Sequence, residues 1–279
     1  MPGLIDKSRI CLYTLLENGR MSAKQIITAA GRYGVGGVEL MSFCEELGAP
    51  NVEVARELCR TARDSGLALP CFSVYADLSR NFSVDKDRLK GYAEICAENS
   101  IPLLHHTVDP DLGSFSMTFS ERNDRFLRDC ERLLDVLEYT ESLGVGTVIE
   151  DQGFVFNGAE SLSRLCEASR GRVGVVADIG NILFVDESPA DLINTLFDRI
   201  KHVHIKDYRV TGAPIIGKRS YKTRFGRYLT DCEIGVGDAD ALLSVKTLEA
   251  LGYKGMYSLE FAALESFDEA QRVIDGLTV

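Results

Sequence analysis

Residues 145–150 read VGTVIE, a strand-like apolar run that ends on the carboxylate of Glu150. Three later runs have the same pattern: VGVVAD ends at Asp178, HVH ends at His204 and MYSLE ends at Glu260. Stretches with the periodicity of amphipathic helices separate these runs. If the four strands lie parallel in a closed barrel, their last residues meet on one rim. The pattern therefore predicts three carboxylates and one imidazole at one end of the fold, a set able to bind a divalent cation.

Strand alternation supports this arrangement, because residues i and i+2 of a strand point to the same face. The pairs expected inside the barrel are Val148 with Glu150, Val176 with Asp178, His202 with His204, and Ser258 with Glu260. The residues between them, expected to face the helices, are Ile149, Ala177, Val203 and Leu259. A buried carboxylate is costly unless it is paired, protonated or bound to metal. Any one of these groups can instead cap a helix or form an ion pair, but four at successive strand ends favour a shared site.

Eight strand-like segments alternate with helix-like ones along the chain. The expected strands cover residues 9–14, 35–40, 69–75, 102–108, 145–150, 173–178, 201–205 and 255–260. Helix starts are indicated by capping boxes at Ser22–Gln25 and Ser266–Glu269, and by Ser188-Pro189. The first strand lacks the glycine-rich phosphate turn typical of an open, doubly wound sheet. We therefore expect residues 1–279 to form one α/β domain, a single (β/α)8 TIM barrel.

Composition narrows the class of protein further. The formal net charge of −11 argues against a nucleic-acid-binding protein, because phosphate contacts depend on lysine and arginine. No apolar run approaches the roughly 20 residues that span a bilayer, and the first residues lack the apolar segment of a secretory signal. The eight cysteines include no C-x-x-C pair and are expected to be reduced, buried thiols. We expect a cytoplasmic protein that acts on a small molecule and has no nucleic-acid or membrane partner.

Five short motifs carry a resemblance to a known superfamily. They are Glu150–Gly153 (EDQG), Asp178–Asn181 (DIGN), His202–Asp207 (HVHIKD), Ile234–Asp238 (IGVGD) and Ser258–Phe261 (SLEF). The chain resembles, over nearly its whole length, the sugar phosphate isomerase/epimerase superfamily of xylose-isomerase-like TIM barrels. Its members include ketose 3-epimerases, hydroxypyruvate isomerases, inosose dehydratases and metal-dependent abasic-site endonucleases. The resemblance implies a homo-oligomer with one divalent metal ion on Glu150, Asp178, His204 and Glu260, and with proton exchange between substrate and the two glutamates.

The chain also departs from the superfamily pattern. Relatives often carry Asn-His where this chain has Asp151-Gln152, and many epimerases have histidine at the position of Asn181. The endonuclease branch needs additional histidines for a cluster of three metals, but the only four are His105, His106, His202 and His204. Together with the acidic net charge, this places an abasic-site endonuclease behind the other activities.

The predicted ligands form a hard, oxygen-rich site, which suits Mn²⁺, Mg²⁺ or Co²⁺, with Zn²⁺ as an alternative. Such a cation can chelate a carbonyl and its neighbouring hydroxyl and stabilise an enediolate. With Glu150 and Glu260 on opposite faces, returning the proton to the same carbon gives epimerisation and returning it to the adjacent carbon gives isomerisation. We expect a metal-dependent isomerase or epimerase of a small ketose, sugar acid or sugar phosphate. The alternatives are a dehydratase of an inosose-type keto-polyol and a noncatalytic sugar-binding barrel.

Further residues are candidate substrate contacts: Glu39, His106, Asn181, Lys206 and Arg219. Glu39 has inward parity, and an ion pair inside the barrel is its alternative role. Only one of the neighbours His105 and His106 can face the barrel centre, and a purely structural role is the alternative for each. His202 is expected one layer below His204, as its support. The basic segment 208–231 indicates an anionic substrate, with a solvated loop or a subunit contact as alternatives.

Overall fold

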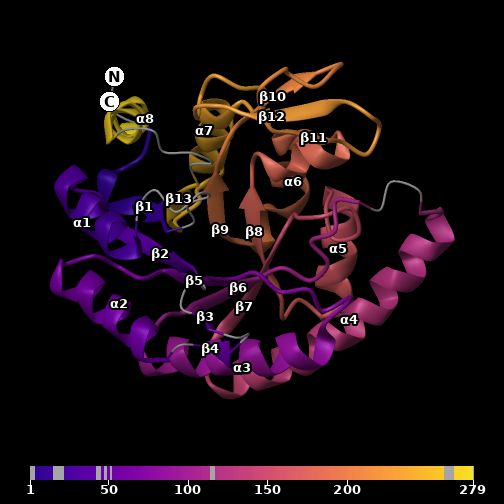
Figure 1. The fold of residues 1–279 in the computed structure, drawn as a ribbon, viewed down its shortest axis with the longest axis horizontal. Coiled ribbons are helices and arrows are strands. Elements are labelled where there is room, and N and C mark those ends of the chain that lie inside the picture. The colour runs from indigo at the N-terminus through magenta and orange to yellow at the C-terminus, as the bar shows by residue number, and fades with distance from the viewer. Residues whose placement is uncertain are drawn as a thin grey trace.

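A computed structural model describes residues 4–14, 22–41, 45–46, 49–50, 52–113, 117–260 and 267–278. Eight parallel strands close into a barrel, in the order β1-β13-β9-β8-β7-β6-β5-β2, and helices surround it (Figure 1). The strands are β1 (Ile10–Tyr13), β2 (Gly37–Met41), β5 (Cys71–Val74), β6 (Leu103–His106), β7 (Gly146–Glu150), β8 (Gly174–Asp178), β9 (Ile200–Ile205) and β13 (Tyr257–Leu259). Each lies within one residue of a segment expected from the sequence, so the TIM-barrel prediction is confirmed.

Helices follow the strands of the barrel. Within the described residues they are α1 (Ala23–Tyr33), α2 (Val52–Asp64), α3 (Phe82–Glu98), α4 (Phe119–Ser142), α5 (Ala159–Ala168), α6 (Pro189–Leu196), α7 (Ala241–Leu251) and α8 (Phe267–Thr278). Ser22 caps α1 in a capping box with Gln25, and Ser188 caps α6 with Pro189 in its first turn. These two helix starts agree with the sequence patterns, whereas Ser266 of the third lies outside the described residues. Three short 3-10 helices are η1 (Lys7–Arg9), η2 (Asn181–Val185) and η3 (Phe197–Arg199).

The apolar core has two parts, which follow the alternation of the strands. Ile149, Ala177, Val203 and Leu259 are buried in the large cluster between barrel and helices. Cys71, Val148 and Val176 form a separate buried cluster, against which Leu103 packs. The expected parity of the later strands is therefore correct, and small apolar side chains fill the barrel interior beneath its polar end.

The basic segment 208–231 folds into a small antiparallel sheet that the sequence analysis did not expect. Its strands are β10 (Tyr208–Thr211), β11 (Ser220–Lys222) and β12 (Tyr228–Asp231), with β12 in the middle. This sheet lies beyond the tips of β8 and β9 (Figure 1). A two-stranded sheet pairs β3 (Glu45–Glu46) with β4 (Ala49–Pro50). Both additions lie outside the closed barrel, so they leave the strand ends free to form a site.

Seven cysteines fall in the described part of the chain, and all of them are free thiols. Six are buried and Cys232 is half-buried, as expected for small apolar side chains. None of the described helices combines the length and the apolar composition that a membrane crossing requires.

Candidate metal centre

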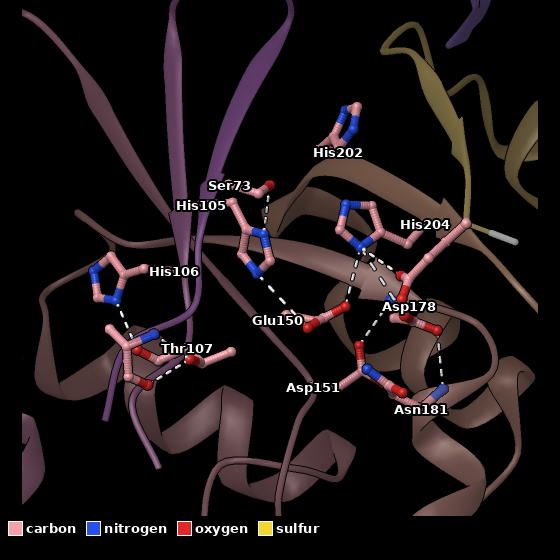
Figure 2. A network of polar contacts seen from close by, with 12 residues as sticks. Ser73, His105, His106, Thr107, Glu150, Asp151, Asp178, Asn181, His202 and His204 are labelled. Atoms are coloured by element: carbon pink, nitrogen blue, oxygen red, sulfur yellow. Dashed lines mark hydrogen bonds and ion pairs between the residues drawn. The ribbon is translucent and has the colours of Figure 1, made fainter. Parts of the chain in front are cut away.

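The four strand-end residues converge at the carboxyl end of the barrel. Glu150 ends β7, Asp178 ends β8, His204 lies in β9, and Glu260 directly follows β13. One ligand atom from each of them lies within 4.8 Å of the others, and all four side chains are buried. Figure 2 shows Glu150, Asp178 and His204 directed toward one another. Closure of the barrel thus brings together groups that are as much as 110 positions apart in the sequence, from 150 to 260.

His204 presents different nitrogens to two groups of carboxylates. Its Nδ1 lies 3.0 Å from Glu150 Oε1 and 3.4 Å from Glu260 Oε2. Its Nε2 lies 3.0 and 3.1 Å from the two carboxylate oxygens of Glu39. Burial lowers the pKa of His204, but the surrounding carboxylates, Glu39 foremost, raise it well above its usual value, so the imidazole is a cation when no metal is bound. A metal ion that takes the place of the Nδ1 proton would leave the Nε2 proton donated to Glu39 and the Nδ1 lone pair facing the strand-end carboxylates. This is the arrangement by which a carboxylate orients a metal-binding histidine.

Glu39 is the centre of a buried polar network below the strand ends. It is fully buried and also accepts hydrogen bonds from His202 Nε2, at 2.8 Å, and from the Ser73 hydroxyl. Burial would raise the pKa of Glu39, but the neighbouring charges of His204 and His202 outweigh it and hold that pKa well below its usual range. Glu39 is therefore an anion that supports His204, and His202 lies next to it, with Ser258 Oγ 2.9 Å from the same Nε2.

The carboxylates of Asp178 and Glu260 each keep one oxygen for a further ligand. Asp178 Oδ1 accepts hydrogen bonds from the backbone N–H groups of Gly180, at 2.8 Å, and Asn181, at 2.9 Å. Asp178 Oδ2 and Glu260 Oε2 are buried and accept no hydrogen bond, although each lies near one cationic group: Lys206 for Asp178 and His204 for Glu260. The Lys206 ammonium lies between the two residues, 2.6 Å from Glu260 Oε1 and 3.0 Å from Asp178 Oδ2. A buried carboxylate oxygen without a hydrogen bond is costly, so these oxygens fit a bound cation.

Burial and neighbouring charges shift the pKa values of the carboxylates at this centre in different directions. Burial raises the pKa of Asp178 well above its usual value, although the Lys206 ammonium opposes the shift. For Glu150, the hydrogen bond to His204 and the charge of His204 outweigh burial and lower the pKa. A divalent ion would favour the ionised form of every carboxylate here. Three carboxylate oxygens and one imidazole nitrogen therefore fit a hard divalent cation such as Mn²⁺ or Mg²⁺.

A cavity of about 190 Å³ opens next to these ligands. Glu150 and Glu260 both line it, together with Tyr13, Met41, Val74, Tyr75, His105, Thr107, Gln152 and Lys206. Tyr75 is half exposed at 52%, which places it at the mouth of the cavity. The cavity thus has room for a small molecule whose reacting atoms lie beside both glutamates.

Comparison with known proteins agrees with this geometry. A sequence profile described as xylose isomerase-like TIM barrel matches residues 27–277. The chain belongs to this family. A search of curated protein sequences gives no match for the xylose isomerase-like chain.

Solved structures share the fold of this xylose isomerase-like barrel at low sequence identity. The 3-keto-D-glucoside 4-epimerase of E. coli has 15% identity and a TM-score of 0.72, over 96% of this chain and 97% of that one. A probable 3-DHS dehydratase of Bacillus anthracis has 16% identity and a TM-score of 0.70, over 97% and 99%. A xylose isomerase-like TIM barrel protein of Mycobacterium smegmatis, in complex with magnesium, has 14% identity and a TM-score of 0.68, over 92% and 88%.

The structure places the expected substrate contacts of this xylose isomerase-like barrel in different surroundings. Lys206 lines the cavity, whereas Glu39 lies beneath it and Asn181 holds Asp178 through its backbone. Arg219 is not part of the lining, and its guanidinium lies 4.8 Å from the centre of the Tyr221 ring. The basic segment therefore does not bring this arginine to the cavity wall.

The histidine pair of β6 differs from the expectation that His106 faces the substrate. His105 lines the cavity, and its Nε2 lies 3.7 Å from Glu150 Oε2. His106 points away from the ligand group, with its Nδ1 2.9 Å from the Thr107 carbonyl (Figure 2). Neighbouring strand residues face opposite sides, so turning His105 inward turns His106 outward. The pairing of β6 with β7, which sets Val148 opposite His105, was the missing signal.

Proposed function

We propose that this barrel is a divalent-metal-dependent isomerase or epimerase acting on a small ketose, sugar acid or sugar phosphate. One observation supports the proposal most directly: Glu150 and Glu260 belong to the candidate ligand group and also line the same cavity. They stand on β7 and after β13, with β8 and β9 between them in the barrel. A substrate in the cavity therefore meets two carboxylates from different directions.

A cation held by Glu150, Asp178, His204 and Glu260 would polarise a substrate carbonyl and acidify the neighbouring C–H bond. The two glutamates then act as proton carriers. Burial alone would raise the pKa of each, but hydrogen bonds and charges from His204 and Lys206 outweigh it, so both pKa values are lowered. An ionised carboxylate can accept a proton from one face of a carbon, and its protonated form can return it.

His105 is suited to hold a substrate hydroxyl next to Glu150. The Ser73 hydroxyl donates its single proton to Glu39 and lies 2.8 Å from His105 Nδ1, so that nitrogen carries the proton. His105 Nε2 is then an acceptor, and it is buried without a hydrogen-bond partner. A substrate hydroxyl placed there donates to His105 and orients the adjacent carbon toward Glu150.

A dehydratase of a keto-polyol is the second candidate, and Lys206 favours it. Its ammonium lines the cavity 2.6 Å from Glu260 Oε1 and can donate a proton to a leaving hydroxyl. Burial lowers the pKa of Lys206, but the charges of Asp178 and Glu260 raise it well above its usual value. Such a lysine holds its proton firmly, which ranks dehydration behind isomerisation or epimerisation.

Deuterium exchange tests the proposal. The purified protein is supplied with Mn²⁺ or Mg²⁺ and a panel of neutral, acidic and phosphorylated ketoses in D₂O, and NMR follows deuterium at the reacting carbon. We expect Glu150→Gln and Glu260→Gln each to slow exchange by about 10²- to 10⁴-fold. Glu141→Gln is the matched control, because Glu141 forms an ion pair with Arg172 on the surface.

Full exchange in both cavity variants would contradict the assigned roles. Release of water, seen as an unsaturated product in the same spectra, would favour the dehydratase.

A further inference from the structure

A second cavity, of about 200 Å³, lies beside the first turns of α4 and α5. Its lining shares no residue with that of the metal cavity. Three arginines converge on it from separate parts of the chain: Arg122 from α4, Arg164 from α5, and Arg224 from the turn after β11. In Figure 1 the start of α4, α5 and β11 all lie on the right of the barrel. We call this cavity the arginine pocket.

None of the three guanidinium groups forms an ion pair with any residue that the structure describes. Each donates instead to a neutral oxygen: Arg164 to Asn123 Oδ1 at 2.7 Å, Arg224 to the Phe154 carbonyl at 2.9 Å, and Arg122 to the Met117 carbonyl at 3.4 Å. The Nε groups of Arg122 and Arg224 are buried and have no hydrogen-bond partner. The three arginines are half-buried, but a buried N–H donor without an acceptor is costly, so an anion placed in the pocket would satisfy these two donors.

The nearby acidic residues are already engaged or face solvent. Glu160 lines the pocket but is exposed, and it forms no ion pair within the described chain. Asp186 pairs with Arg227 at 2.7 Å, and Glu187 accepts the backbone N–H of Ala159 at 2.9 Å. The charges of Glu187 and Asp186 raise the pKa of Arg224, but less than burial and Arg122 lower it, so these groups offset the positive charge of the pocket only in part.

Arg122 and Arg224 lie close enough to influence each other. Burial lowers the pKa of Arg224, and the positive charge of Arg122 lowers it further. The guanidinium of Arg164 lies 4.4 Å from the centre of the Phe126 ring, which fixes its plane at the edge of the pocket. Like charges kept together in this way gain stability when an anion is placed between them.

We propose that the arginine pocket binds a phosphate group, either free or carried by a small metabolite, at a site separate from the metal cavity. The planar guanidinium fork matches the oxygens of a phosphate and can bind two of them at once. The first turns of α4 and α5 lie beside the pocket, but Glu121 caps α4 and Glu187 accepts the Ala159 N–H, so the guanidinium groups and not the helix ends would bind the phosphate. The volume exceeds the roughly 30 Å³ of a single water molecule several times, which leaves room for the anion.

Calorimetric titration of the purified full-length chain with inorganic phosphate, at constant ionic strength, tests this proposal. We expect saturable binding that weakens at least about tenfold in Arg122→Gln and in Arg164→Gln. Arg164→Lys, which keeps the charge but loses the fork, should fall between wild type and Arg164→Gln. Arg172→Gln is the matched control, because Arg172 pairs with Glu141 on the surface, and it should bind phosphate as the wild type does.

Two further arms complete the experiment. Glycerol phosphate binding more tightly than inorganic phosphate would identify a phosphorylated metabolite as the source, and the reverse order would identify the free ion. Amide hydrogen exchange is measured on the wild-type protein, so its result does not depend on the folding of a variant. Phosphate should slow the exchange of backbone amides at residues 119–126 and 159–164. Absence of saturable binding, wild-type affinity in both the Arg122→Gln and Arg164→Gln variants, or protection confined to the metal cavity would overturn the proposal.

Discussion

The metal centre is built on the ends of barrel strands and the arginine pocket on segments that follow such strands, and their charges are opposite. The metal centre gathers three carboxylates around His204 and Lys206. The arginine pocket gathers three guanidiniums, and the one carboxylate in its lining is exposed. Buried carboxylate oxygens of Asp178 and Glu260 accept no hydrogen bond at the metal centre, and buried Nε groups of Arg122 and Arg224 donate none in the arginine pocket. The difference shows that one scaffold can prepare sites for ligands of opposite charge, because the loops after different strands vary independently.

The largest effect that tests this comparison is expected from removing one carboxylate charge at the metal centre. Asp178→Asn keeps the shape of the side chain but loses an anionic ligand, so the affinity for Mn²⁺ should fall by about 10³-fold. Calorimetric titration with Mn²⁺ measures this, with Asp135→Asn as a control in a surface ion pair with Lys86. Unchanged affinity in Asp178→Asn would place the metal elsewhere.

A pH effect of intermediate size is expected from His106, which belongs to neither region. Burial lowers the pKa of His106 to about 4, from an ordinary 6.5. Between these values the unfolded chain binds more protons than the folded one, so the stabilisation present above pH 6.5 is lost as the pH falls to 4. The loss amounts to about 3 kcal/mol. Urea unfolding at several pH values measures it, and His106→Gln should show a shallower decline. An identical slope in this variant would remove His106 as the cause.

A smaller effect is expected from Glu39, which touches the metal centre only through His204. Glu39→Gln should weaken Mn²⁺ binding by about 10- to 100-fold, because His204 loses the carboxylate that orients it. Nitrogen NMR of His204 in the Mg²⁺-loaded protein gives a second measurement: the proton should lie on Nε2 in the wild type and be shared between both nitrogens in the variant. Glu141→Gln should change neither quantity. Wild-type affinity together with an unchanged tautomer in Glu39→Gln would refute the positioning role.

The smallest effects concern independence of the two regions. Arg122→Gln should bind Mn²⁺ within about twofold of wild type, and Asp178→Asn should bind phosphate within about twofold, because distant sites without shared partners behave additively. Crossed titrations of both variants with both ions measure this. A change larger than tenfold in either cross-titration would show that the comparison describes one coupled site.

Periodicity predicted most of the fold because a barrel strand is a local feature. Runs such as 145–150 and 173–178 carry their own length, alternation and end point, and the structure has strands there. The ligand group was also accessible from the sequence, since parallel closure puts all strand ends on one rim. The resemblance to xylose isomerase-like barrels added which of these ends act together.

What the sequence could not provide depends on contacts between distant segments. The local sequence does not distinguish His105 from His106 as the residue that faces the cavity. Only the pairing of β6 with its neighbours decides this. The contact of Glu39 with His204 spans 165 positions. Arg122 and Arg164 sit in ordinary amphipathic helices, where an arginine usually lies in a solvated face. Basic residues were noticed in segment 208–231 instead, because they are adjacent there.

The shielded thiols have a practical consequence for work on this protein. Burial raises the pKa of Cys59 to about 11 and that of Cys130 to about 12, and Cys232 likewise has a pKa of about 12. Alkylating reagents attack the thiolate, so in neutral solution the buried Cys59 and Cys130 react when the chain opens, whereas the half-buried Cys232 reacts slowly from the folded state. The rate at which the buried cysteines are labelled therefore reports transient unfolding of this chain. A bound cation that stabilises the folded barrel should lower that rate.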